Sequence, residues 1–559
     1  MRTLRVIPFL LLSLSACAHA GRQDFRCPAR GGTAWRELRS EHFVVQTDLP
    51  QGRARELASE LERILGAVRH GLFRTPPPMP GAIRVVALRS IEEFDLFAPP
   101  KAGAFYDRSS TTVVLPGELA EAQRLVIAHE LTHHVLARAF ARQPPWFAEG
   151  TAAFMETMGG IGVPTLGGVP AWRYQAVFPY HGGIGAVLVA RGRLDARQYD
   201  LAWALVHFLN NRRPREFAEL QVRFGRGQDP AAAWREVFPA WDPAAPGGAE
   251  RLDDELGRYL ASGKYAYKDV RLPPSSGPSE RAMTASEAHG VRLSLPWTNR
   301  GKPFRIEAVL AEVDEALAED PGNVPALSKG AVARPAQALA YARRAVELHP
   351  ENARAWLLLW EHLPQEDAAG REDALRRAVQ ADPENAIALN NLAWALLGAG
   401  KSGEALPLAR KAATFAPWDS AALDTLAGVM ADLGQCAEAL QVQRRATDVL
   451  PEAAPEKVRR EYTERLEHLE RTCRVGSSGS PAGAGAPAPR AAAGVTLPAA
   501  AKLPRGTGLL PARRARRRGR RGRRARAARS RARARTPTPG GGASRAASRR
   551  APTRRTWRA

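Results

Sequence analysis

A regular spacing of prolines in the second half of the chain is the feature that most limits its fold. Segments with helical periodicity alternate with prolines at Pro321, Pro350, Pro383, Pro417 and Pro451. The last three intervals are 33, 34 and 34 residues long. A helical unit of this length cannot bury its apolar face alone, so neighbouring units must stack into an array.

The best-preserved unit, residues 382–417, reads DPENAIALNNLAWALLGAGKSGEALPLARKAATFAP and resembles the tetratricopeptide repeat. Small or apolar residues stand where its two helices must pack, at Leu392, Ala393, Gly400, Ala405 and Pro417. The next unit keeps the pattern at Leu426, Ala427, Gly434 and Ala439. The resemblance implies an all-α repeat domain over residues 304–473 with a concave surface that binds protein segments. The alternative is a repeat array that serves only as a spacer.

The first half of the chain has a different pattern. Short apolar runs bounded by turn residues predict strands, and apolar residues at helical spacing predict helices. The predicted strands are 41–48, 83–88 and 111–115, and the predicted helices are 53–72, 118–142, 199–210 and 214–223. These elements predict a mixed α+β domain over residues 35–272, after an N-terminal tether at 18–34. Residues 273–303 are rich in Ser, Pro and Gly and are interpreted as a linker.

One predicted helix, residues 118–142, is apolar nearly all the way round and yet carries ionisable groups. Its sequence includes HELTHH, in which His129 and His133 lie one helical turn apart and Glu130 lies beside them. Burying ionisable groups without partners costs several kcal/mol each. The pattern His-Glu-x-x-His provides two nitrogen ligands for zinc and a carboxylate that can reach a water on the ion.

A catalytic zinc needs a third protein ligand, which must come from another element. Pro144 and Pro145 turn the chain, and the following segment WFAEGTAAFME returns Glu149 toward the histidines. Here the sequence resembles the gluzincin metallopeptidases, in particular the peptidase MA-like group, whose third ligand is the glutamate of W-L-x-E-G-x-A. The resemblance implies an α+β zincin-like metallopeptidase domain with Zn²⁺ bound by His129, His133 and Glu149. It also implies that Glu130 is the general base.

The same resemblance implies positions for the substrate and for further site residues. A peptide is expected to lie along an edge strand, which we assign to 111–115. Residues 103–107, Gly-Ala-Phe-Tyr-Asp, lack the glutamate with which aminopeptidases of this type hold a free amine, so an endopeptidase is favoured. Tyr199 is the candidate for stabilising the oxyanion, with His207 as the alternative. Glu156 is the reserve ligand or a residue that orients a histidine, and His134 is interpreted as a core or surface residue.

The N-terminus, MRTLRVIPFLLLSLSAC, has two arginines followed by an apolar run that is short for a transmembrane helix. Its end, Leu14-Ser15-Ala16-Cys17, resembles a bacterial lipobox. Residues 1–17 are therefore interpreted as a lipoprotein signal peptide, with Cys17 lipidated and the chain exported to the cell envelope; the alternative is an ordinary signal peptide. An oxidising compartment permits a Cys436–Cys473 disulfide, and unpaired thiols are the alternative.

The basic charge of the chain is concentrated at its C-terminus. Residues 474–559 hold 24 of the 81 Lys and Arg residues and no Asp or Glu, so the rest of the chain balances 57 basic against 57 acidic residues. The composition predicts a disordered tail. Because the remainder is neutral and the N-terminus predicts export, we expect no nucleic-acid partner.

These patterns together favour a membrane-tethered zinc metallopeptidase that cleaves envelope proteins or peptides and binds substrates or partners through its repeats. The alternative is a non-catalytic envelope scaffold that acts through the repeats and carries a degenerate peptidase domain.

Overall fold

The computed structural model describes residues 25–100, 102–107, 112–117, 119, 121–158, 163–298, 301, 306–450 and 454–477. The predicted signal peptide and Cys17 lie outside these ranges, as do residues 478–559 of the predicted tail. Within the described ranges, no helix combines the length and apolarity needed to cross a membrane.

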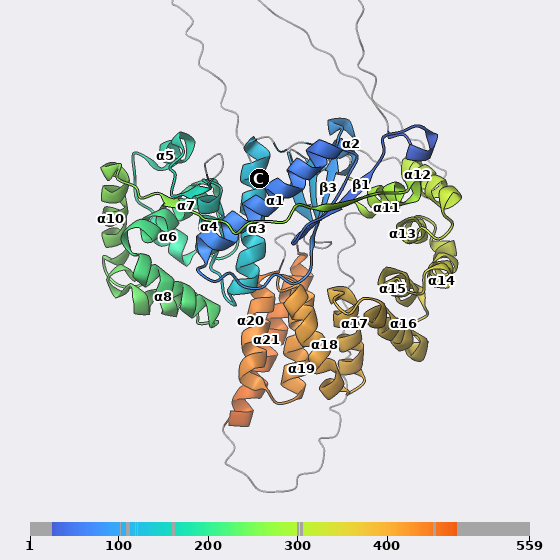
Figure 1. Cartoon of the computed structure of the whole chain (residues 1–559). Coiled ribbons are helices and arrows are strands. Elements are labelled where there is room, and N and C mark those ends of the chain that lie inside the picture. Colours follow the sequence, from blue (N-terminus) through green and yellow to red (C-terminus); the bar gives the residue numbers. More distant parts are fainter. Residues whose placement is uncertain are drawn as a thin grey trace, which may run out of the picture. The chain divides into compact units, whose positions relative to one another are not determined.

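A six-stranded mixed sheet lies in the first half of the chain (Figure 1), with the strand order β4-β5-β3-β2-β1-β8. Strands β2, β3 and β5 are parallel, and β4, β1 and β8 each pair antiparallel with a neighbour. The bounds are β1 Arg36–Arg39, β2 Phe43–Thr47, β3 Ile83–Leu88, β4 Phe105–Asp107, β5 Thr112–Pro116 and β8 Ser279–Ala282. The three strands predicted from the sequence are β2, β3 and β5.

Alternating side chains of the central strands enter two different cores, as a pleated strand requires. On one face, Val85 and Val113 belong to a large core that includes α1 (Gln51–Leu72) and α3 (Glu121–Ala139). On the other face, Val86 and Val114 pack in a smaller core with α2 (Ile91–Phe97) and α11 (Ala285–Ser294). The sheet therefore has helices on both faces, and α3 lies on the face with α1.

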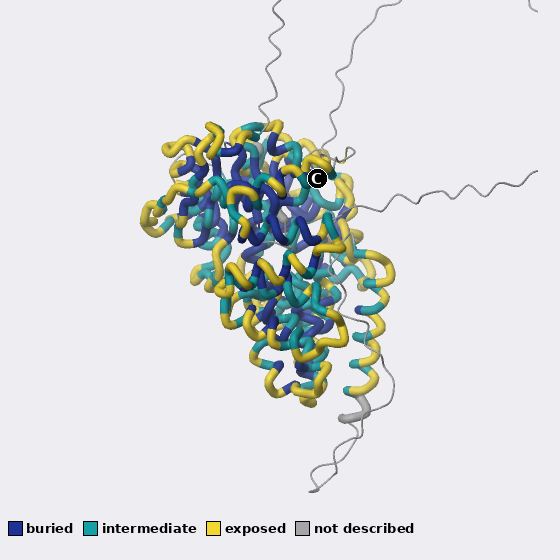
Figure 2. Tube along the Cα trace, turned by 90° about the vertical axis from the view of Figure 1, so that its right-hand side faces the viewer, coloured by how far each residue is buried: buried dark blue, intermediate teal, exposed yellow. Residues whose placement is uncertain are grey.

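Helices follow α3 almost without interruption, and most of them were not predicted. They are α4 Pro145–Met155, α5 Ala171–Val177, α6 Ile184–Val189, α7 Ala196–Arg212, α8 Pro214–Gly225, α9 Pro230–Val237 and α10 Gly248–Ser262. A two-stranded ribbon joins β6 Thr165–Leu166 to β7 Lys268–Asp269. Among the described residues, buried positions lie in the interior and exposed positions lie on the outer turns (Figure 2).

The second half of the described chain is a stack of antiparallel helices. They are α12 Ile306–Glu319, α13 Val324–Ala333, α14 Ala338–Leu348, α15 Ala353–His362, α16 Ala368–Ala381, α17 Ala386–Gly398, α18 Ser402–Phe415, α19 Ser420–Asp432, α20 Cys436–Asp448 and α21 Glu456–Ser477. The side chain of an Asn or Asp caps α13, α15, α17 and α19 by accepting from a backbone N–H in the first turn. Each cap follows a proline-containing turn, which explains why the prolines mark the repeats.

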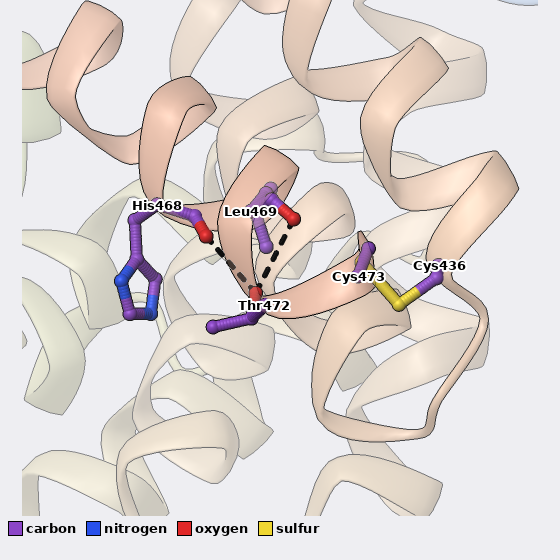
Figure 3. Close-up of a disulfide and its surroundings, with 5 residues drawn as sticks. All are labelled: Cys436, His468, Leu469, Thr472 and Cys473. Atoms are coloured by element: carbon purple, nitrogen blue, oxygen red, sulfur yellow. Dashed lines mark hydrogen bonds between the residues drawn. A yellow bond between two sulfur atoms is a disulfide. The ribbon is translucent and has the colours of Figure 1, made fainter. Parts of the chain in front are cut away.

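A disulfide between Cys436 and Cys473 joins α20 to α21 (Figure 3), which confirms the predicted pair. The two cysteines are 37 residues apart in the sequence. Closing a loop of this size lowers the entropy of the unfolded chain and stabilises by about 3–4 kcal/mol. We expect Cys473→Ala to lower the free energy of unfolding of the last repeats by that amount in denaturant titrations. An unchanged transition in the variant would show that α21 is held by packing alone.

The predicted fold class, an α+β zincin-like domain followed by all-α repeats, is wrong. The described chain is mainly helical, and its sheet is small. Helical segments between residues 171 and 262 account for part of the difference, because their short apolar patterns predicted only α7 and α8. Residues 273–303, interpreted as a linker, contain β8 and α11. Strand β8 pairs with β1, so this segment is part of the sheet.

Candidate metal centre

His129 and His133 lie one turn apart on α3, the helix that packs against both α1 and α4. Their Nε2 atoms are 3.0 Å apart. Both residues are only partly exposed, whereas Leu131 and Val135 on the same helix are buried in the core. Packing of the apolar side chains therefore fixes the rotation of α3 about its axis, and with it the side on which the two imidazoles lie.

Glu149 reaches the same point from α4. Its Oε2 atom lies 3.6 Å from Nε2 of His129 and 3.6 Å from Nε2 of His133. The following residue, Gly150, allows α4 to lie close to α7, because a Cβ there would be 2.5 Å from the carbonyl oxygen of Ala202. The three residues predicted as ligands therefore come together at one point, with their ligand atoms within 4.8 Å of one another.

The dimensions and chemistry of this triangle fit a zinc ion. Ligands about 2.0–2.1 Å from a tetrahedral zinc are separated by roughly 3.3 Å. The distances between the three ligand atoms, 3.0, 3.6 and 3.6 Å, lie on either side of that value. Two imidazole nitrogens and one carboxylate oxygen also form a donor set typical of catalytic zinc.

Glu156 lies behind His129 and orients it. The Glu156 Oε1 atom is 2.8 Å from His129 Nδ1, so Nδ1–H donates to the carboxylate and Nε2 keeps its lone pair for the centre. Arg173 on α5 donates to the other oxygen of Glu156 and also to Asp200 at 2.8 Å. This chain of contacts agrees with the orienting role considered for Glu156. Arg173 and Asp200 carried no recognisable sequence signal, because both positions depend on the packing of α5 against α7.

Tyr199 on α7 is also at the centre. Its hydroxyl lies 3.0 Å from His129 Nδ1 and donates to Glu156 at 3.2 Å. Burial, together with the charges of Glu156 and Glu149, raises the pKa of Tyr199 well above its ordinary value. The phenol therefore stays protonated, and its O–H is a hydrogen-bond donor.

The surroundings of His129 favour positive charge. Burial opposes protonation of His129, but the neighbouring carboxylates of Glu149 and Glu156 raise its pKa to about 9. Burial likewise opposes the charged form of Glu149, but the adjacent imidazoles of His129 and His133 hold its pKa far below the ordinary range. A cation is therefore well accommodated between these groups.

Glu130 faces a small apolar cavity between α3 and the sheet, together with Ala104, Phe105 and Val113. The edge strand here is β4, which pairs antiparallel with β5. The prediction that residues 111–115 form the edge is therefore wrong. The three-residue strand β4 was missed because it is too short to show an alternating pattern.

Two other histidines lie apart from the three candidate ligands. His207 is buried, with Nδ1 2.6 Å from the Tyr259 hydroxyl and Nε2 3.2 Å from the Gly167 carbonyl, and burial lowers its pKa to about 4. It is a core residue and not the alternative oxyanion group. His134 is also buried, and its ring lies 4.6 Å from that of Trp418 in the repeat array.

The centre opens on a cavity of about 890 Å³, which is lined by residues from both halves of the chain. His133 and Glu149 line it from α3 and α4, and Trp418, Arg445 and Asp448 line it from the repeats. Arg445 donates to the carbonyl oxygen of Ala137 at 2.5 Å. The Asp448 carboxylate pairs with Arg142 at 2.6 Å. The last repeats therefore form part of the wall beside the candidate ligands, a feature that the sequence did not predict.

The tetratricopeptide repeat family model matches residues 374–406, which overlap the unit recognised in the sequence at 382–417. No peptidase family match accompanies it, and no curated protein matches the chain. Solved structures that match include MamA, at 21% identity over 26% of this chain and 88% of that one, with a TM-score of 0.22. Yeast Tom70 matches at 13% identity over 76% of this chain and 74% of that one, with a TM-score of 0.29. At these scores the structural likeness carries no weight for function.

Proposed function

We propose that this protein is a zinc-dependent peptidase whose helical repeats hold protein segments next to the metal centre. The observation that carries the proposal is the triangle of His129, His133 and Glu149. Its three atoms have the separations and chemistry of a catalytic zinc site, and Glu130 follows the first ligand on the same helix. The proposal rests on this site and not on the fold of the surrounding domain.

Each residue of the site has a role in peptide hydrolysis. A zinc ion held there supplies a Lewis acid that polarises a carbonyl and brings the pKa of a water near 7. Glu130 accepts the proton of the attacking water and passes it to the leaving amine. Glu156 holds the tautomer of His129, and Arg173 holds Glu156. Tyr199 is assigned the role of a hydrogen-bond donor to the developing oxyanion, for which its protonated phenol is suited.

The repeats supply binding of protein, which is the function that tetratricopeptide arrays typically have. The family match to residues 374–406 supports this part of the proposal directly. The cavity wall formed by Trp418, Arg445 and Asp448 supports a bound segment reaching the centre, because the same cavity includes His133 and Glu149. Its volume of about 890 Å³ lies near the upper end of typical ligand pockets.

A second candidate function is a non-catalytic scaffold that binds protein through the repeats alone. The family match favours it, because that match covers the repeats and not the metal centre. Export to the cell envelope, with lipidation at Cys17, is a further proposal. It rests on the sequence of residues 1–17.

The full-length protein tests the proposal through its metal and its activity. We expect zinc in the purified chain, cleavage of casein used as an unfolded protein substrate, loss of cleavage after chelation, and recovery when zinc is returned. The physical reason is that the two imidazoles and the carboxylate hold the ion that polarises the carbonyl. Casein that binds but stays intact before and after addition of zinc would contradict the peptidase and support the scaffold.

A further inference from the structure

A second group of metal-binding side chains lies far along the sequence from the first. Cys27, His289 and Glu315 each offer a ligand atom, and these atoms lie within 4.8 Å of one another. Cys27 begins the short 3-10 helix at Pro28–Arg30, His289 lies on α11, and Glu315 lies on α12. We propose that these three residues bind a zinc-type divalent cation that fastens the N-terminal segment to the start of the helical array.

His289 is prepared as a ligand. It is fully buried, and its Nδ1 atom lies 2.7 Å from Glu312 Oε1. The carboxylate of Glu312 also accepts from Arg292 Nε at 2.9 Å and so stays in place. A histidine whose Nδ1–H donates to a fixed carboxylate presents Nε2 as a lone pair, which is the arrangement found behind metal-ligating histidines.

The other ring nitrogen of His289 has no hydrogen-bond partner. Its Nε2 atom is buried and unpaired among the described residues, although buried polar atoms are nearly always satisfied. A metal ion accepts the lone pair that no donor reaches. This orphaned nitrogen is independent of the cysteine and points to a ligand.

Cys27 and Glu315 complete the donor set. Cys27 is a free cysteine with 2% of its surface exposed. Glu315 is partly exposed, and one of its oxygens lies 3.0 Å from Arg30 Nη2. Thiolate and imidazole together select zinc over magnesium or calcium, and a fourth position remains for water.

The position of the cluster explains what the ion does. Residues 25–31 run beside α11 and α12 (Figure 1), and Phe25 packs against the core that includes α11. The Phe25 ring stacks on the Arg292 guanidinium at 3.8 Å and meets the His289 ring edge-on at 5.2 Å. An ion bound by Cys27 and two helices closes the loop between the N-terminus and residue 315 and so couples the sheet to the repeats.

Cobalt substitution of the full-length protein tests this site separately from the peptidase centre. A thiolate ligand gives cobalt a charge-transfer band in the near ultraviolet, which the His129, His133 and Glu149 set cannot produce. We expect the band in the wild-type chain and in His133→Ala, and its loss in Cys27→Ser. Glu315→Gln, at a partly exposed position, should weaken cobalt binding without unfolding the chain. His349→Gln serves as the histidine control outside the cluster.

The zinc content distinguishes failure of this proposal from failure of the proposed function. Two zinc ions in the wild type, falling to one in Cys27→Ser and to one in His133→Ala, support both sites. A single zinc that Cys27→Ser keeps and His133→Ala loses overturns the second site and leaves the peptidase. A single zinc that Cys27→Ser loses supports the second site and counts against the peptidase. A folded wild-type chain with no thiolate band in excess cobalt overturns the proposal without any variant.

Discussion

Glu130→Gln is expected to slow peptide hydrolysis by a factor on the order of 10²–10⁴ while the zinc content stays unchanged. The substitution keeps the size of the side chain and removes only its ability to accept a proton. Glu130 is not one of the three residues whose atoms form the triangle, so binding of the ion does not depend on it. Casein cleavage and zinc per chain, measured on the same preparation, check both halves of the expectation.

Glu121→Gln is the matched control for this variant. Glu121 lies in the first turn of the same helix, α3, and is exposed. The Glu121→Gln variant should cleave casein at the wild-type rate. A Glu130→Gln chain that holds zinc and cleaves at the wild-type rate would remove Glu130 from the reaction.

The elements that were predicted well are those whose pattern lies within the local sequence. Strand β3, Ile83–Leu88, has the predicted bounds, because a short apolar run between turn residues is compatible with few structures other than a buried strand. Helix α1 begins two residues before its predicted start and shows the expected buried face. The meeting of His129, His133 and Glu149 was predicted because two side chains one helical turn apart and a third after a Pro-Pro turn all lie within residues 129–149.

What the sequence did not predict depends on partners far along the chain. Strands β1 and β8, of sequence RELR and SERA, have no apolar run. They pair as an antiparallel ladder, and charges also meet across the strands, as between Arg36 and Glu280 at 2.7 Å. Such pairs between residues more than 240 apart leave no local pattern. The repeat wall of the cavity was missed for the same reason, whereas the Arg173–Glu156 contact was missed because it depends on how α5 packs against α7.

The fold and the site therefore lead to different conclusions about function. The described chain is mainly helical, and the family match covers a helical repeat at residues 374–406. The cluster of His129, His133 and Glu149 is not needed to hold α3 in place, because apolar contacts with α1 and α4 already do so. Packing energy alone does not require two imidazoles and a carboxylate at one point. Their presence is the reason for proposing a peptidase with repeats instead of a scaffold.

His133→Ala is expected to abolish casein cleavage and to remove the zinc of this centre, while binding of casein by the repeats persists. Removing one of three protein ligands leaves a donor pair that cannot hold a catalytic ion in a fixed geometry. His133 lines the shared cavity, but the residues that line it from the repeats, Trp418 and Arg445, are untouched. Binding can be followed by fluorescence anisotropy of labelled casein, with zinc content and cleavage measured in parallel.

His181→Ala is the control for the His133 variant, since His181 is exposed and is not among the three candidate ligands. It should keep the metal, the cleavage and the binding. Equal losses of binding and cleavage in His133→Ala would mean that the metal centre itself holds the protein segment. Cleavage that survives loss of the ion would leave the repeats as the functional part of the chain, because the centre would then have no role in hydrolysis.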